Sequence, residues 1–119
     1  MIYNEEYKIK FYKDSLSGRE PVADYICRLE ERERNKVNKY LEFLRLSRGY
    51  LDEPYSRHLQ GKIRELRVDF NNNYHRIIYF TYFNKTIILL HAFLKKSQKT
   101  PSKEKEIAWS RYLNIINEN

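Results

Sequence analysis

The chain opens with a pattern in which lysine alternates with apolar residues. Residues Tyr7 to Tyr12 read YKIKFY. Because neighbouring side chains of a strand point to opposite faces of a sheet, this alternation predicts a half-buried strand. The stretch Asp14 to Glu20 is polar and contains Gly18, so we expect it to form a loop.

Helical spacing replaces the alternation after this loop. Pro21 suits the first position of a helix, where no backbone N–H donor is needed, and Val22, Ile26 and Leu29 follow at i, i+4 and i+7. A second helix is predicted to end near Gly49. Its apolar positions are Val37, Tyr40, Leu41 and Leu44. Together the helices form a hairpin that must bury its apolar stripe on a larger element.

Two features of this helical region carry chemistry of their own. Glu30 to Arg34 reads EERER, which is typical of a solvated helix end, with a charged docking face as the alternative. Cys27 is the single cysteine and lies among the apolar helix positions. We expect a buried, inert thiol, because nothing nearby in the sequence would lower its pKa.

Three strands are predicted in the second half of the chain. Their ranges are Ile63 to Phe70, Tyr74 to Phe83 and Ile87 to Leu94. The last of them is almost wholly apolar and should be buried on both faces. The turns between them are Asn71 to Asn73 and Asn84–Lys85. The preceding stretch, Leu51 to Gly61, is predicted to be a loop.

A final helix follows the last strand. Thr100 is a suitable cap and Pro101 a suitable first residue. The apolar stripe of this helix is Trp109, Tyr112, Leu113 and Ile116. The predicted order of elements is therefore β-α-α-β-β-β-α, in a single domain spanning residues 1–119.

Composition and net charge limit the classes of function that are possible. The chain has 119 residues, of which 41% are hydrophobic, and it lacks both a membrane-spanning run and a signal-peptide pattern. We therefore expect a folded domain in the cytoplasm. One cysteine and three scattered histidines give no zinc-ligand spacing, so neither a metal nor a cofactor is predicted. The net charge of +7, from 23 Lys+Arg against 16 Asp+Glu, indicates an anionic partner such as nucleic acid or an acidic protein segment.

The strand pattern also collects positive charge on one face of the sheet. Leu66 and Val68 share one face of their strand, and Glu65 and Arg67 share the other. If the helical hairpin covers the apolar pair, the charged pair lines the opposite face. Arg76 lies one hairpin away and is expected to project beside that pair.

Lys95 and Lys96 leave the last strand, and one or both of them would join Arg67 and Arg76 in one concavity. Such a cluster suits a phosphodiester. Guanidinium groups bind phosphate oxygens in bidentate fashion, and a lysine crowded by cations has a lowered pKa and can move protons. RNA supplies its own nucleophile in the 2′-hydroxyl, so it can be cleaved without a metal.

The same residues also have structural readings. Glu65 and Arg67 could be a same-face pair, Arg76 a buried structural arginine, and Lys95 to Lys103 a solvated turn. His91 lies inside an apolar run, which favours a satisfied core histidine over a catalytic one. Surface positions are predicted for His58 and His75, and core packing for Tyr79 and Tyr82.

Four ordered motifs together carry a family resemblance. They are Leu59-x-Gly61-x-Ile63-x-Glu65-Leu66-Arg67, Tyr74-x-Arg76-Ile77-Ile78-Tyr79, Leu89-Leu90-His91-x-Phe93-x-Lys95-Lys96-x-Gln98-Lys99-Thr100-Pro101 and Glu104-x-Glu106-Ile107-Ala108. On these motifs the chain resembles the HigB-like, phage Gp49-related branch of the RelE/ParE toxin superfamily, over roughly residues 59 to 111.

The resemblance implies an α/β (α+β) fold with a small, twisted, antiparallel-dominated sheet of about four strands. It further implies the toxin of a type II toxin–antitoxin pair, acting as a ribosome-dependent mRNA endoribonuclease, with a helix-turn-helix, HigA-like antitoxin as partner. The implied catalytic residues are Arg67, Arg76, Lys95 and Lys96. The candidate contacts to RNA or the ribosome are Lys62, Arg64, His91 and Lys99.

One departure and two alternatives remain open. Some RelE-like toxins place a lysine where Glu65 stands here and use a late tyrosine, whereas Tyr112 belongs to the apolar stripe of the final helix. Glu65 could therefore be a base or could only orient Arg67. The alternatives are a ParE-like toxin that inhibits a protein such as gyrase, and a degenerate nucleic-acid-binding module. An antitoxin is expected to neutralise the basic cleft through acidic or apolar contacts across it.

Overall fold

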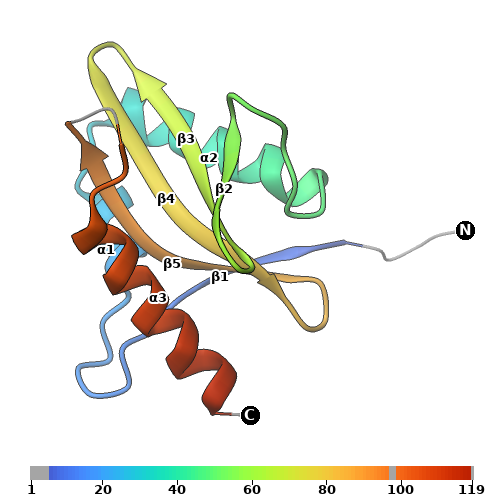
Figure 1. The fold of residues 1–119 in the computed structure, drawn as a ribbon. Helices are drawn as coiled ribbons and strands as arrows, with labels where there is room; N and C mark the ends of the chain where they lie inside the picture. Colours follow the sequence, from blue (N-terminus) through green and yellow to red (C-terminus); the bar gives the residue numbers. More distant parts are fainter. Residues whose placement is uncertain (1–5, 97–98, 119) are drawn as a thin grey trace, which may run out of the picture.

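The computed structural model describes residues 6–96 and 99–118, so Gln98 of the third motif lies outside the described residues. Five strands form one sheet in the order β1-β5-β4-β3-β2, and helices pack on both of its faces (Figure 1). The elements are β1 Lys8–Phe11, α1 Pro21–Cys27, α2 Glu31–Leu46, β2 Ser56–Gln60, β3 Ile63–Phe70, β4 Asn73–Tyr82, β5 Thr86–Lys95 and α3 Ser102–Asn117. Among these helices, none is both long and apolar enough to cross a membrane.

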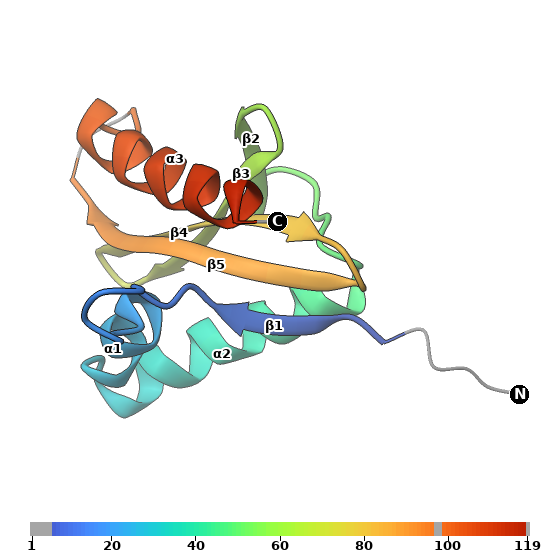
Figure 2. The same cartoon turned by 90° about the horizontal axis from the view of Figure 1, so that it is seen from below.

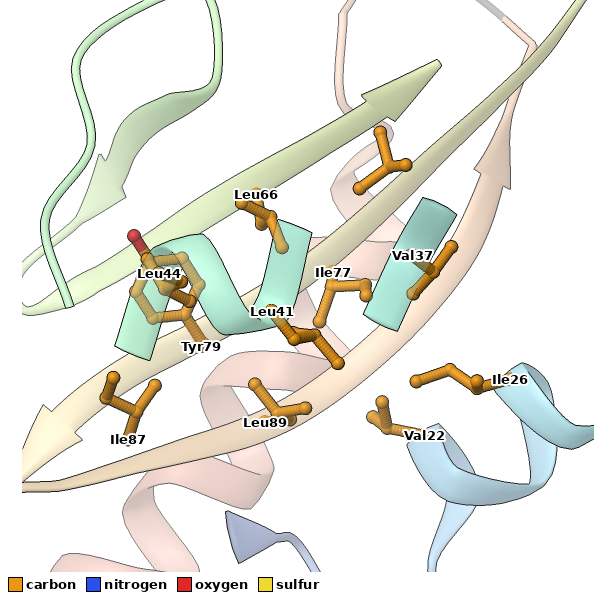
Figure 3. Packing of buried hydrophobic residues seen from close by; sticks show 11 residues of the cluster. Val22, Ile26, Val37, Leu41, Leu44, Leu66, Ile77, Tyr79, Ile87 and Leu89 are labelled. Carbon is orange, nitrogen blue, oxygen red and sulfur yellow. The ribbon is translucent and has the colours of Figure 1, made fainter. Parts of the chain in front are cut away.

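The sheet separates two hydrophobic cores. Figure 2 shows α1 and α2 on one side of the sheet and α3 on the other. The helical hairpin covers Leu66 and Val68, as the alternation predicts, and buries them with side chains of α1, α2, β4 and β5 (Figure 3). The second core lies under α3, where Tyr112 packs edge-on against Phe80 with ring centroids 4.8 Å apart.

Strand register sets which side chains meet. In the antiparallel β3–β4 pair, Arg67 lies directly opposite Arg76. The β4–β5 pair is antiparallel too, with an irregularity between Ile78 and Tyr79. The partner of Ile78 is His91 and the partner of Tyr79 is Leu89, so one extra residue is inserted into β5 at this point.

The turns behave as their residues predict. Asn84 and Lys85 both adopt positive φ, at 55° and 54°, which is the backbone of the two-residue hairpin turn expected there. Asn71 also adopts positive φ. Gly49, which follows α2, has φ 85°, and a side chain at this position would collide with Thr81.

The structure corrects two predictions about the secondary-structure elements, one for the segment before β3 and one for the start of the final helix. Ser56–Gln60 is strand β2, not part of a loop, so the sheet has five strands. Its sequence SRHLQ is mostly polar because β2 is an edge strand, paired with β3 alone. The final helix begins at Ser102 with Pro101 as its N-cap residue. Thr100 does not cap it.

Three predictions of exposure are also wrong. Cys27 is exposed, because it lies one residue beyond Ile26 and so off the apolar stripe of α1. Glu33, within the charged run, is only 7% exposed, and His75 is only 2% exposed. Burial of Glu33 and His75 is possible because they are partners: Nε2 of His75 is hydrogen-bonded to Oε2 of Glu33.

Candidate functional site

An open groove of about 860 Å³ lies where β5 ends and the β3–β4 turn begins. Its cationic lining is Arg67, Arg76, Lys95 and Lys96. The remaining lining residues are Asp69, Asn72, Asn73, Tyr74 and Leu94. We call this the basic groove. The four cations are the four residues predicted to be catalytic, and β3, β4 and β5 bring them together on the sheet.

Arg76 is the most constrained residue of the basic groove. It is 4% exposed, and its Nη1 donates to Oδ1 of Asp69 at 2.7 Å and to the carbonyl oxygen of His75 at 2.9 Å. Its guanidinium carbon lies 6.0 Å from the centroid of the Tyr74 ring. The buried Nε has no hydrogen-bond partner among the described residues. Arg76 is therefore held rigidly while one of its donors is left over.

Lys95 lies at the end of β5, opposite Tyr74 of β4, and is 7% exposed. Burial lowers the pKa of its ammonium below the usual 10.5. The carboxylate of Glu65 opposes this effect, and the guanidinium groups of Arg76, Arg67 and Arg57 lower the pKa further. The surroundings of Lys95 thus favour release of a proton. Lys96, which follows it, is exposed.

Glu65 lies beneath this cluster and is completely buried. Its Oε2 accepts a hydrogen bond of 2.6 Å from the Thr100 hydroxyl, and its Oε1 has no partner among the described residues. The carboxylate does not reach the groove lining. The geometry therefore fits a supporting role for Glu65 better than that of a base acting on substrate.

Arg57 is a further basic residue that the sequence reading missed. It lies on β2 directly opposite Glu65 and is exposed. Its charge contributes to the lowered pKa of Lys95. The sequence predicts a loop for this segment, and a loop has no defined face to which Arg57 could be assigned. An alternation signal in SRHLQ, with Ser56 and Leu59 as the less exposed residues, is weak and irregular.

The predicted RNA contacts are dispersed. Arg64 lies on the helical-hairpin face of the sheet, where its Nε donates to Ser56 Oγ at 3.0 Å and its guanidinium stacks on Tyr50. Lys62 is exposed in the β2–β3 turn, and Lys99 is exposed between β5 and α3. None of the three lines the basic groove.

His91 is tied to α3. Its Nε2 lies 2.6 Å from Oε1 of Glu104, and its Nδ1 accepts a hydrogen bond from Arg111 Nη1 at 3.3 Å. Burial lowers the pKa of its imidazole, Glu104 opposes this, and Arg111 lowers it further. With both ring nitrogens bonded, His91 fits the reading of a satisfied histidine. It does not line the basic groove.

A second polar cluster lies on the other face of β4. The Tyr25 hydroxyl lies 2.7 Å from Nδ1 of His75, Nε2 of His75 is hydrogen-bonded to Glu33, and Asn73 donates to Glu33 at 3.0 Å. Burial, together with the charge of Glu33, raises the pKa of Tyr25 to about 12. We call Tyr25, Glu33 and His75 the buried polar cluster. One sequence signal was available, since Glu33 lies four residues before Val37 on the buried stripe of α2.

The described residues contain no group of three or more His, Cys, Asp or Glu side chains arranged to hold a metal ion. Comparison with known families gives a match over residues 24–113, to the family described as "Phage derived protein Gp49-like (DUF891)". The matched range includes every residue of the basic groove and of the buried polar cluster. No curated protein matches the chain.

Proposed function

The chain belongs to the Gp49-like family of phage-derived proteins, a HigB/RelE-like toxin family, and from this premise we propose that it cleaves messenger RNA on the ribosome. Family membership also implies an antitoxin partner, for which we propose a helix-turn-helix, HigA-like protein. The observation that carries the nuclease proposal is the basic groove, in which Arg67 faces Arg76 and Lys95 has a lowered pKa.

Substrate binding follows from the charges in the basic groove. Two guanidinium groups on adjacent strands offer several N–H donors to the oxygens of one phosphodiester. An anion between Arg67 and Arg76 would relieve the repulsion between them.

The proposed reaction needs no nucleophile from the protein. The 2′-hydroxyl oxygen of the RNA forms a bond to the adjacent phosphorus and gives up its proton to a water molecule. The bond from phosphorus to the 5′-oxygen breaks, and the departing oxygen takes up a proton. The products are a 2′,3′-cyclic phosphate and a 5′-hydroxyl. Negative charge accumulates on the phosphorus oxygens during this step, and the fixed guanidinium groups stabilise it.

Lys95 is the proposed proton donor to the departing 5′-oxygen. Its lowered pKa brings proton release closer to neutral pH, where general acid catalysis is most effective. Glu65 is a positioning residue in this scheme. Its buried carboxylate favours the protonated form of Lys95 and, through Thr100, holds the chain that leaves β5.

The test uses purified translating ribosomes with the wild-type protein and with Arg76→Ala. New 5′ ends within translated codons, present with the wild type and absent with the variant, support the proposal. The same cuts in both proteins would contradict the proposal that RNA is cleaved in the basic groove. If neither protein cuts RNA on the ribosomes, yet expression of each in bacteria arrests growth, a toxin that binds a protein target would instead be favoured.

A further inference from the structure

Helix α2 carries a second apolar face, of which Tyr40 alone packs against the core on the sheet. Val37, Leu41 and Leu44 point into the core and are buried. A second set, Tyr40, Phe43 and Leu46, is spaced at i, i+3 and i+6 and so lies along a different side of the helix. Of these, Phe43 is 43% exposed and Leu46 is 65% exposed. An outer helix face of this kind is ordinarily polar.

The loop that follows α2 extends this face into a depression. Tyr40, Phe43, Leu46, Leu51 and Tyr55, together with Ser47, line a hollow of about 390 Å³. The Tyr40 ring contacts the Phe43 ring at 5.7 Å and the Tyr55 ring at 6.0 Å between centroids. We call these six residues the α2 patch. It lies on the opposite face of the sheet from Arg67 and Arg76.

The charges that border the α2 patch are positive along α2, where two lysines lie over its rings, and negative in the following loop, where Asp52 and Glu53 are exposed. The Nζ atom of Lys36 lies 5.6 Å from the Tyr40 ring centroid, and that of Lys39 lies 5.9 Å from the Phe43 ring centroid. Of the three acidic residues of α2, Glu33 is bonded to His75 and Glu42 to Arg45, and Glu31 lies in the first turn of the helix. The patch is therefore an apolar hollow with a basic border at one end.

We propose that the α2 patch binds an acidic, amphipathic helix of the antitoxin. Apolar side chains of that helix would fill the hollow, and its carboxylates would pair with Lys36 and Lys39. This proposal rests on the proposed function, since it needs an antitoxin. It places the antitoxin's principal contact on α2, whereas the sequence led us to expect it across the basic groove.

A protein segment fits the α2 patch better than RNA or a second copy. Bases stack on open aromatic faces, but ammonium groups already lie over the Tyr40 and Phe43 rings. Two copies of this chain each carry a net charge of +7, which opposes their association. An acidic helix adds ion pairs and buries the exposed rings.

The experiment begins with a selection. Genes of the source genome are expressed beside the wild-type toxin, and the protein that restores growth is purified. Calorimetry then measures its affinity for wild type, Leu46→Asp and Lys39→Glu, and hydrogen exchange maps its footprint. We expect about a 100-fold loss with Leu46→Asp, about a tenfold loss with Lys39→Glu, and protection of amides along α2. The matched control is Phe83→Asp, which changes a residue that is 66% exposed in the β4–β5 turn and should leave the affinity unchanged.

Other outcomes overturn the proposal. These are an unchanged affinity of Leu46→Asp, protection confined to the basic groove, or a selection that yields no neutralising protein. A wild-type dimer that Leu46→Asp dissociates would assign the patch to a second copy, and lost ribosome binding by Leu46→Asp would assign it to RNA. The nuclease is tested separately, since Leu46→Asp should cut RNA like the wild type. If the antitoxin binds through the α2 patch but the toxin cuts no RNA, the nuclease proposal is refuted and the docking proposal stands.

Discussion

His75 and Arg76 are neighbours on β4, yet they belong to clusters of opposite character. His75 points toward the helical hairpin, where Tyr25 and Glu33 satisfy both of its ring nitrogens. Arg76 points to the other face, where its buried Nε and Oε1 of the nearby Glu65 have no partner among the described residues. The same strand thus supports one completed polar network and one incomplete network.

The difference separates stability from function. A buried polar group without a partner costs about 1–3 kcal/mol, so a cluster that tolerates two such groups is not arranged for stability alone. Completed networks make a fold rigid. We therefore expect substitutions in the buried polar cluster to change unfolding, and substitutions in the basic groove to change RNA cleavage.

The largest effect is expected from Arg76→Ala. Removing a fixed donor to the developing charge should lower the cleavage rate about 10²- to 10³-fold, measured by single-turnover cutting of ribosome-bound message. The control is Arg19→Ala, which alters an exposed arginine in the loop before α1. Full cleavage by Arg76→Ala would place the chemistry outside the basic groove.

Lys95→Arg keeps the positive charge and removes the proton donor. We expect about a hundredfold slower cleavage at neutral pH, the lower end for general acid catalysis. Wild-type activity should fall as pH rises through the pKa of Lys95, below 10.5, and the variant should lack this decline. The decline is not unfolding. Because the folded pKa is below the unfolded one, the contribution of Lys95 to stability increases with pH across that window. An identical pH profile in the variant would refute Lys95 as the acid.

In the buried polar cluster, Glu33→Ala is expected to lower the free energy of unfolding by about 1–3 kcal/mol, because it leaves His75 without an acceptor. Urea denaturation measures this change. The control is Glu31→Ala, which changes an exposed residue two positions earlier on the same helix and should have little effect on the free energy of unfolding. At a temperature where both variants are folded, cleavage should stay near the wild-type rate. A large loss of cleavage in a fully folded Glu33→Ala would show that the two clusters are not separate.

The smallest effect is expected from Glu65→Gln, at about tenfold in cleavage, which corresponds to roughly 1.4 kcal/mol. Loss of the carboxylate removes the influence that raises the pKa of Lys95, so the alkaline limb of the rate profile should move to lower pH. NMR titration of the Lys95 side chain should show the same shift without RNA. Glu106→Gln, an exposed change on α3, is the matched control. An unmoved Lys95 titration would leave Glu65 with a purely structural role.

Much of the fold could be predicted from local pattern. The alternation in Ile63–Phe70 and the apolar run of β5 gave the central strands. Arg67 and Arg76 followed from strand faces, and the lysines followed from their place at the end of the last strand. Strand β2 could not be predicted because an edge strand with mostly exposed positions has no clear alternation. This segment is a strand because its backbone pairs with β3, and that pairing leaves no local sequence pattern.

The buried polar cluster escaped prediction for a different reason. A histidine in a strand and a glutamate in a charged run both resemble surface residues. Only their contact, between positions 42 residues apart, makes burial possible. Likewise, the bond from Thr100 to Glu65 depends on how the chain returns over the sheet after β5. Local patterns do not contain such long-range pairings.

The parallel pairing of β1 with β5 has a consequence for the order of synthesis. Lys8 pairs with Thr86 and Phe11 with Leu89. Strand β1 is synthesised first, and it cannot pair until β5, the last strand, has left the ribosome. Strands β2, β3 and β4 can pair earlier through short turns, since local contacts form faster than distant ones. Lys95 and Lys96 are also among the last parts of the sheet to emerge. A growing chain therefore lacks a complete basic groove until most of it has been made. Under the proposed function, it could not cleave the message that encodes it while it is still being synthesised.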